Sequence, residues 1–271
     1  MRGSSRGAVR QGRAAFDAAL PTVADKAVLA DELFAVTALL DENATLRRAL
    51  PDPSREGSDK AALAQRLLAG KVSEAASSIV SALVAGRWSQ ERDLSDTTER
   101  LAVEASLVGA EQEGRIDTVE DELFRFERVV AASPELRDTL TNRQGDAAGK
   151  AEVVSTLLRD KAAPESVRLA RQAVLAPRGR RFDTVLDTYL RYAAARREQL
   201  TAVVTTAAPL TPEQTARLAS ALQRIYSKPI LVQQLIEPDV IGGIRVQVGD
   251  EVVDGTVLRR LDEARRHLAG G

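Results

Sequence analysis

The side chains of this chain that could perform acid and base catalysis occur as adjacent carboxylates. There are pairs at Asp31-Glu32, Asp41-Glu42 and Asp121-Glu122, and two carboxyl groups with different pKa values can act as general acid and general base. Each pair falls on the polar side of a predicted helix, where neighbouring residues point about 100° apart. We therefore interpret all three pairs as solvated helix faces rather than as catalytic pairs.

A glycine pair near the C-terminus could bind phosphate through its backbone. A phosphate-binding loop, however, needs Gly-Lys-Ser/Thr before a helix, and a dinucleotide site needs three spaced glycines at a strand-to-helix turn. Gly242-Gly243 instead leads into residues 244–248, whose alternating pattern predicts a strand. An RNA-binding loop of the KH type joins two helices, which this segment does not. We assign Gly242, Gly243 and also Gly255 to backbone turns that require a positive φ angle.

One basic cluster and one histidine complete the candidates for chemistry. For Arg178-Gly179-Arg180-Arg181 we favour a surface loop, with an anion site as the alternative. His267 is the only histidine, so it cannot form a catalytic triad with a second base or a site of several histidines for a metal. Cysteine is absent, which excludes thiolate catalysis. The sequence indicates no enzyme, cofactor, metal site or small-molecule substrate.

The composition is typical of a helix-rich globular protein. Of 271 residues, 44% are hydrophobic and only 3% are aromatic, so the core must consist largely of Ala, Leu and Val. The formal net charge of -1 argues against nucleic acid as a partner, because phosphate binding requires a basic surface. Apolar runs are shorter than the ~18 residues that a membrane-spanning helix needs. We expect no direct insertion into a membrane.

The N-terminal part of the sequence repeats itself at an offset of 90 residues. Residues 31–71 and 121–161 share 12 identities in 41 ungapped positions, beginning with Asp-Glu-Leu-Phe in both segments. Apolar residues at three- and four-residue steps predict amphipathic helices in each copy. Ser133-Pro134-Glu135 predicts the start of one of them, with serine as the N-cap and proline at the first helical position. We therefore expect two tandem helical bundles, over residues 1–95 and 96–200, that arose by internal duplication. Residues 93–114 contain no breaker except Gly109 and predict one long helix that joins the bundles.

Beyond residue 200 the apolar period becomes that of strands. Residues 201–208 and 230–237 predict strands on either side of a helix that begins with the capping box Thr211-Pro212-Glu213-Gln214. A hairpin and a final helix from residue 256 follow. The expected fold class is mainly α with a small β-α-β-β-α domain over residues 201–271.

Several segments carry a family resemblance. They are residues 203–211, residues 236–246 with Gly249-Asp250 and Asp254-Gly255-Thr256, and upstream residues 113–117, 134–137 and 150–152. Together they resemble the delta subunit of bacterial F-type ATP synthases, a relative of the mitochondrial oligomycin-sensitivity-conferring protein. The resemblance covers roughly residues 96 to 268. Residues 1–95 are additional and resemble the longer form found in actinobacteria.

The resemblance implies a non-catalytic stator subunit, peripheral on the cytoplasmic face of the plasma membrane. Its helical domain would hold the N-terminal segments of the alpha subunits, its C-terminal domain would bind the b subunit, and together they would resist rotor torque so that rotation is coupled to ATP synthesis. The implied alpha-binding groove lies between the first and fifth helices of the second bundle, at Leu101, Ala105, Val108, Val167, Ala170 and Val174, with core packing as the alternative for each. The implied stalk contact is the last helix, at Arg259, Asp262 and Arg266.

The additional N-terminal copy has no counterpart in shorter family members. We expect it to contact the stalk or the side wall of the head, because a duplicated bundle presents a second groove. A helical adaptor or regulatory protein unrelated to energy conversion is the alternative function.

Overall fold

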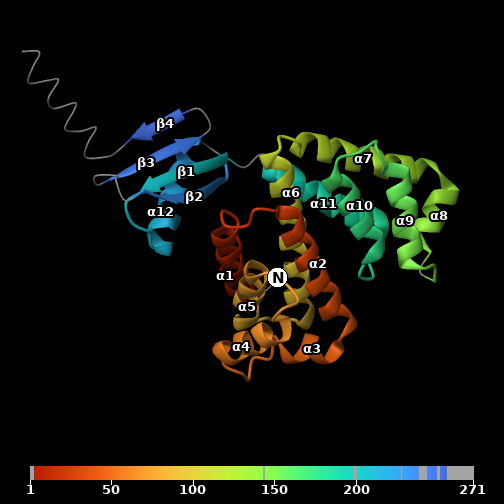
Figure 1. Ribbon diagram of the computed structural model, residues 1–271, viewed down its shortest axis with the longest axis horizontal. Helices are drawn as coiled ribbons and strands as arrows, with labels where there is room; N and C mark the ends of the chain where they lie inside the picture. The colour runs from red at the N-terminus through yellow and green to blue at the C-terminus, as the bar shows by residue number, and fades with distance from the viewer. Residues whose placement is uncertain are drawn as a thin grey trace, which may run out of the picture. The chain divides into compact units, whose positions relative to one another are not determined.

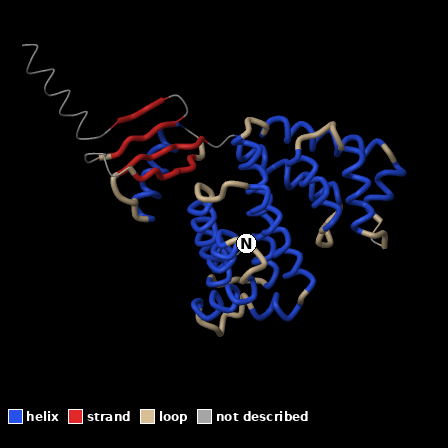
Figure 2. Tube along the Cα trace, in the orientation of Figure 1, coloured by secondary structure: helices blue, strands red, loops and turns tan. Residues whose placement is uncertain are grey.

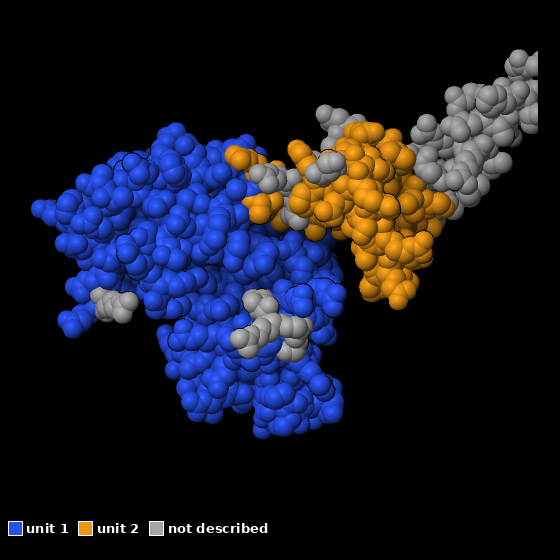
Figure 3. Space-filling view, turned by 180° about the vertical axis from the view of Figure 1, so that it is seen from behind, with its two compact units in different colours: residues 1–194 blue, residues 195–271 orange. Residues whose placement is uncertain are grey.

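The computed structural model describes residues 3–142, 144–197, 200–226, 228–237, 243–248 and 251–254. The chain divides into two compact units, residues 1–194 and residues 195–271 (Figure 3). Over the described residues it has twelve helices and one four-stranded sheet (Figure 2). A mainly helical fold with a small C-terminal sheet is therefore confirmed.

The helices of the first unit follow one another with short connections (Figure 1). They are α1 (Gly3–Ala19), α2 (Lys26–Glu42), α3 (Ala44–Ala49), α4 (Gly57–Leu68), α5 (Glu74–Ala85), α6 (Glu91–Gln112), α7 (Ile116–Ala132), α8 (Pro134–Thr141), α9 (Ala147–Leu158), α10 (Pro164–Leu175) and α11 (Phe182–Arg197).

Side-chain caps explain where many of these helices begin. Asp25, Asn43, Ser73, Ser133 and Asp146 precede α2, α3, α5, α8 and α9, and each accepts a hydrogen bond from a backbone N–H of the first turn. The predicted start at Ser133-Pro134 is confirmed, with Ser133 Oγ accepting from the amide of Leu136.

The predicted long helix is α6. It begins at Glu91, ends at Gln112 and contains Gly109. It contacts α1, α2, α3 and α5, which precede it, and α7 and α10, which follow it (Figure 1). Because neighbours cover it on several sides, even polar residues of this helix such as Thr98 and Glu99 are buried.

One hydrophobic core extends from Ala8 in α1 to Ala193 in α11. Small and branched side chains dominate it, as expected from the composition. Among aromatic side chains, Phe16 and Tyr189 are fully buried in it. The boundary predicted at residue 95 falls within α6, and the core continues across it. The two predicted bundles thus lie in one compact unit.

The second unit is a small layer of one sheet and one helix. Strands β1 (Leu200–Thr206) and β2 (Ile230–Ile236) are parallel and are connected through α12 (Pro212–Tyr226), as a strand-helix-strand crossover requires. Strands β3 (Ile244–Val248) and β4 (Glu251–Asp254) form an antiparallel hairpin, and the sheet order is β2-β1-β3-β4. Ala202, Val204, Val246 and Val248 pack with Leu222 of α12. The predicted final helix lies outside the described residues.

Candidate functional site

The six residues expected to line an alpha-binding groove lie on α6 and α10, which contact each other. Val167 is half-buried, whereas the other five are buried in the common core: Leu101, Ala105, Val108, Ala170 and Val174. Their side chains pack within this chain. Contact of these residues with a partner stays a prediction.

Most of the other predicted positions lie outside the described residues, namely Gly242, Gly255, Arg259, Asp262 and Arg266. Gly243 is described. It directly precedes β3 and has a φ of 85°, in the left-handed region that favours glycine.

The carboxylate pairs do more than face solvent. Asp31 accepts a hydrogen bond of 2.7 Å from Arg168 Nε, and Asp41 binds Arg178. Glu32 accepts from the amide and hydroxyl of Ser73, which caps α5. Asp31 is a solvated position as interpreted, with 60% of its side chain exposed, whereas Asp41, at 27%, is half-buried against Arg178.

The equivalent role at α10 belongs to Glu122. Its Oε2 accepts hydrogen bonds from the backbone N–H of Ala163 at 2.8 Å and from Ser166 Oγ at 2.6 Å. Both donors lie at the N-terminus of α10, where a negative charge is favourable because unpaired N–H groups point outward. Glu122 thus fixes the start of α10 against α7. It serves structure and not catalysis.

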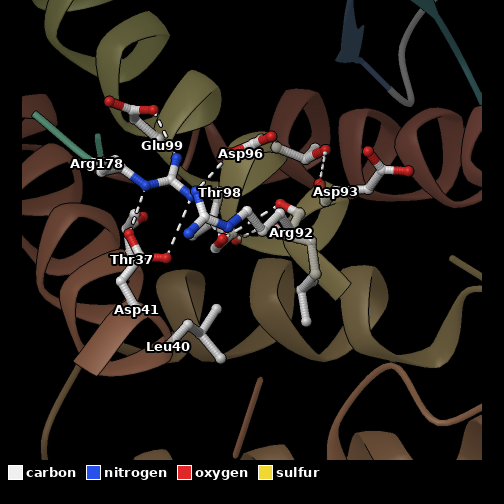
Figure 4. Close-up of polar contacts among 12 residues, drawn as sticks. Thr37, Leu40, Asp41, Arg92, Asp93, Asp96, Thr98, Glu99 and Arg178 are labelled. Carbon is white, nitrogen blue, oxygen red and sulfur yellow. Dashed lines mark hydrogen bonds and ion pairs between the residues drawn. The ribbon is translucent and has the colours of Figure 1, made fainter. Parts of the chain in front are cut away.

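The basic segment contains the most highly connected charge of the described chain. Arg178 adopts a φ of 57°, which is uncommon for a residue with a side chain, and its guanidinium points into the protein. Its Nη1 donates to Glu99 Oε2 at 2.7 Å, and its Nη2 donates to Ser95 Oγ at 2.6 Å and lies 2.8 Å from Asp96 Oδ1 (Figure 4). Its Nε donates to Asp41. The expectation of a surface loop was wrong for Arg178, whose side chain is only 6% exposed.

Two further side chains complete what we call the Arg178 cluster, which consists of Arg178, Asp41, Asp96, Glu99, Arg180 and Tyr189. Arg180 Nη2 donates to Glu99 Oε1, and Tyr189 Oη donates to the same oxygen at 3.1 Å. Glu99 thus accepts from three donors on the α10–α11 connection and on α11. A buried carboxylate is stable in the protein only with such partners.

The electrostatics of the Arg178 cluster follow from burial and from opposite charge. Burial opposes the charged form of Arg178, but hydrogen bonding to Asp41 and the charges of Glu99 and Asp96 outweigh it and raise the pKa. Burial raises the pKa of Asp96, against the opposing effect of Arg178. Burial also raises the pKa of Tyr189, and the Glu99 charge adds to this. The guanidinium of Arg178 is therefore paired inside the protein and is not available to an external anion.

Two grooves of useful size lie in the helical unit. One, of about 720 Å³, lies between the end of α1 and the start of α5. The other, of about 890 Å³, lies between α2 and the end of α10, beside the Arg178 cluster. Grooves of this size accommodate a ligand or a short stretch of helix. Among the described residues, no group of three potential metal ligands is present.

The comparisons with known proteins decide the family. A family model described as "ATP synthase delta (OSCP) subunit" matches residues 103–268. The chain is 50% identical to "ATP synthase subunit delta" of Kineococcus radiotolerans, covering 91% of this chain and 90% of the relative. It is 47% identical to the protein of the same name from Streptomyces coelicolor, covering 99% and 98%, and 41% identical to that of Beutenbergia cavernae over the full length of both.

The chain belongs to the ATP synthase delta (OSCP) family. It is a stator subunit and a non-catalytic part of the ATP synthase. This agrees with a charge cluster that is satisfied internally. The resemblance seen in the sequence is confirmed, and the alternative of an unrelated helical adaptor is not.

The similarity to ATP synthase delta subunits extends beyond the residues that the family model matches. The relatives from Streptomyces coelicolor and Beutenbergia cavernae also align with the first hundred residues, which the family model leaves out. The additional N-terminal helices are therefore shared with other ATP synthase delta subunits. Within the described residues, no helix has the length and apolar character needed to cross a membrane.

Proposed function

We propose that the helical unit holds the N-terminal segments of the alpha subunits and that the C-terminal unit binds the b subunit, at the cytoplasmic face of the plasma membrane. The observation that carries this proposal is the division into two compact units, each with its own hydrophobic core. Two separately folded units can bind two different partners. Such a connector can resist torque between the head and the stalk.

The C-terminal unit leaves apolar side chains on both edges of its sheet. Leu235 and Ile236 on β2 and Val252 and Val253 on β4 are between 47% and 54% exposed. The strand register places Leu235 in a row with Thr205 and with Arg245, on the face opposite α12. Val252 lies on the same face, beside Gln247. Exposed apolar groups rimmed by polar ones are typical of a protein interface, which supports this face as the b-binding surface.

Co-purification of the chain with the alpha and b subunits tests the proposal. Leu235→Arg and Val252→Arg place a charge on the proposed b-binding face, and we expect both variants to lose the b subunit and to retain alpha. Ser220→Arg adds the same charge to the exposed side of α12 and should retain both partners. Retention of b by both sheet variants, with an unchanged unfolding transition, would contradict this assignment.

We also infer that the two groups of helices arose by duplication. The bounds of α2, α4 and α5 recur in α7, α9 and α10 at an offset of 90 residues, and α3 and α8 begin at the same offset. The left-handed residue after α4, Gly70, has its counterpart in Asp160 after α9. Agreement in helix bounds supports an origin from one ancestral bundle.

A shared contact supports the same inference. The carboxylate of Glu32 accepts from the backbone N–H of Ser73, and that of Glu122 accepts from the backbone N–H of Ala163. Donor and acceptor are 41 residues apart in both contacts. The two acceptors, Glu32 and Glu122, lie 90 positions apart. The second helix of each copy thus caps the fifth in the same way. On this inference, residues 1–95 and 96–200 are two copies that share α6.

The first copy, we propose, contacts the stalk or the side wall of the head. Its support is a groove of its own between its first and fifth helices, α1 and α5. Removal of residues 1–90 would test this role, with stator assembly and coupling as the readout. Unchanged assembly and coupling would refute it.

A further inference from the structure

A cavity of about 300 Å³ lies in the second group of helices, between the α8–α9 connection and the α10–α11 connection (Figure 1). Most of its wall is apolar. The apolar lining residues are Leu140, Ala147, Ala173, Val174, Leu175, Pro177 and Phe182. Since a water molecule takes up about 30 Å³ in the liquid, the cavity holds a molecule of about ten non-hydrogen atoms. This volume is at the lower limit of ligand-binding pockets.

The charged side chains at this cavity are all basic. Lys150, Arg180 and Arg181 line it, and no aspartate or glutamate is among the described residues that form its wall. The two arginines belong to the basic segment of residues 178–181, whose first member turns away into the Arg178 cluster. The carboxamide of Asn142 also lines the cavity and adds an N–H donor. Positive charge and hydrogen-bond donors are thus combined with an apolar wall.

The three cations differ in how far the protein already neutralises them. Within the described part of the chain Lys150 has no ion pair, because its Nζ donates to the carbonyl oxygen of Asn142. Arg181 pairs with Asp183 at 2.7 Å, but 76% and 45% of these side chains are exposed, and such a surface pair contributes little free energy. Arg180 is paired with Glu99. Lys150 and Arg181 therefore supply the charge that an anion can bind.

The first copy uses the corresponding lysine differently. Under the offset of 90 residues proposed above, Lys60 corresponds to Lys150. Lys60 is only 1% exposed, and its Nζ reaches from α4 to the carbonyl oxygen of Gly86, after α5, at 2.7 Å. In the second copy the lysine turns to the end of α8 instead, and the cavity lies between α9 and the end of α10. The gap that the lysine spans in the first copy is thus left open in the second.

From these observations we propose that the cavity binds a small organic oxyanion, in which a phosphate or carboxylate group is attached to a short apolar body. The oxyanion lies against Lys150 and Arg181, and the apolar body packs on Leu175 and Phe182. The inference goes beyond the proposed stator contacts, because the ligand is a small molecule and not a subunit. Only the comparison with Lys60 rests on the inferred duplication.

Binding of phenyl phosphate to the full-length chain tests the proposal. This probe has about eleven non-hydrogen atoms, which matches the volume of the cavity, and isothermal titration calorimetry measures its affinity. We expect saturable binding that is at least about tenfold tighter than that of inorganic phosphate, which lacks the apolar body. Phenol lacks the charge and should show no saturable binding. Benzoate distinguishes the two anion classes: tighter binding than phenyl phosphate assigns a carboxylate, and weaker binding assigns a phosphate.

Variants that change charge identify the groups that bind the oxyanion. Lys150→Met removes the ammonium group that has no ion pair and should weaken binding about tenfold. Lys71→Met, at an exposed position outside the cavity, should bind as the unmodified chain does. Asp183→Asn releases Arg181 from its surface partner and should strengthen binding about threefold. If these residues served structure alone, no such gain would occur.

A pair of neighbouring alanines tests the apolar part of the cavity without a change of charge. Ala147 lines the cavity and is half-buried, so Ala147→Leu should fill part of it and weaken phenyl phosphate binding about tenfold. Ala148 is exposed and lies outside this cavity. Ala148→Leu should therefore leave the affinity unchanged.

Several results would overturn the proposal. They are the absence of saturable phenyl phosphate binding, equal affinities for phenyl phosphate and phenol, and equal losses for Ala147→Leu and Ala148→Leu. Lys150→Met also removes the hydrogen bond to Asn142 at the end of α8. If its unfolding transition changes, Asp183→Asn and Ala147→Leu still test the cavity with that contact intact, and unchanged affinity in both variants would overturn the proposal as well.

Discussion

Arg178 and Glu99 form an ion pair of 2.7 Å in which only 6% of each side chain is exposed. The partners are 79 residues apart in the chain, and Arg178 binds Asp41 as well. One guanidinium therefore connects α2, α6 and the segment that leads into α11. The contact thus links the two groups of helices through charge-assisted hydrogen bonds, which are stronger and more directional than neutral ones.

Removal of the charge on Glu99 should destabilise the helical unit. Glu99→Gln leaves Arg178, Arg180 and Tyr189 without their carboxylate acceptor. We expect a loss of about 2 to 3 kcal/mol in the free energy of unfolding, since Arg178 retains Asp41 and Asp96. Urea denaturation measures this. Glu42→Gln, the same change at an exposed position, should stay within about 0.5 kcal/mol of the unmodified chain, and equal effects of the two variants would contradict a structural role for the cluster.

The buried phenol of Tyr189 should make stability depend on alkaline pH. Burial first, and then the charge of Glu99, raise the pKa of Tyr189 well above its ordinary value near 10. The unfolded chain releases this proton near pH 10 while the folded chain keeps it. The contribution of Tyr189 is thus fully present below about pH 10 and is lost as the pH rises from there toward the folded pKa.

Comparison with Tyr189→Phe isolates that contribution. The variant lacks the hydrogen bond to Glu99, so we expect it to be less stable by about 1 kcal/mol at neutral pH. Between about pH 9 and about pH 11, its urea midpoint should fall less steeply than that of the unmodified chain. Parallel slopes would show that groups other than Tyr189 cause the alkaline loss.

Removal of Glu32 or Glu122, which accept hydrogen bonds from the starts of α5 and α10, should destabilise the helical unit to different extents. Glu122→Ala removes the acceptor for Ala163 N–H and Ser166 Oγ and should cost about 2 kcal/mol in the free energy of unfolding. Glu32→Ala should cost less, about 1 kcal/mol, because the Ser73 contact is exposed. Thermal or urea unfolding checks both, with exposed Glu135→Ala as the reference. A negligible effect of Glu122→Ala would mean that the contact does not hold α10.

Local patterns in the sequence predicted much of the fold. Helical periodicity, the cap at Ser133-Pro134 and the alternation over residues 244–248 each depend on neighbours along the chain, and the structure has a helix or strand at all of these places. The long helix α6 was predictable because only Gly109 interrupts its pattern.

The contacts between distant segments were not predictable in this way. Arg178 was expected in a surface loop because arginines are usually solvated, but its burial depends on Asp41, which is 137 residues away. The capping role of Glu122 depends in the same manner on Ser166. A second groove was expected from the duplication, but the residues that the folded helices bring to its wall were not.

The left-handed conformation at Gly243 should make the β3–β4 hairpin sensitive to substitution. Its φ of 85° immediately before β3 costs a residue with a Cβ about 1 to 2 kcal/mol, so Gly243→Ala should weaken the C-terminal unit by that amount. Hydrogen exchange of the β3 amides measures this locally, and Gly243→Asn should cost less because asparagine tolerates the left-handed region. Gly7→Ala is the opposite control: Gly7 lies within α1 with no atom near an added Cβ, so alanine should stabilise that helix by up to about 1 kcal/mol. We expect the β3 amides to exchange faster in Gly243→Ala than in the unmodified chain, and at an unchanged rate in Gly7→Ala. Equal β3 exchange rates in the two variants would show that the backbone geometry at Gly243 does not limit the stability of the sheet.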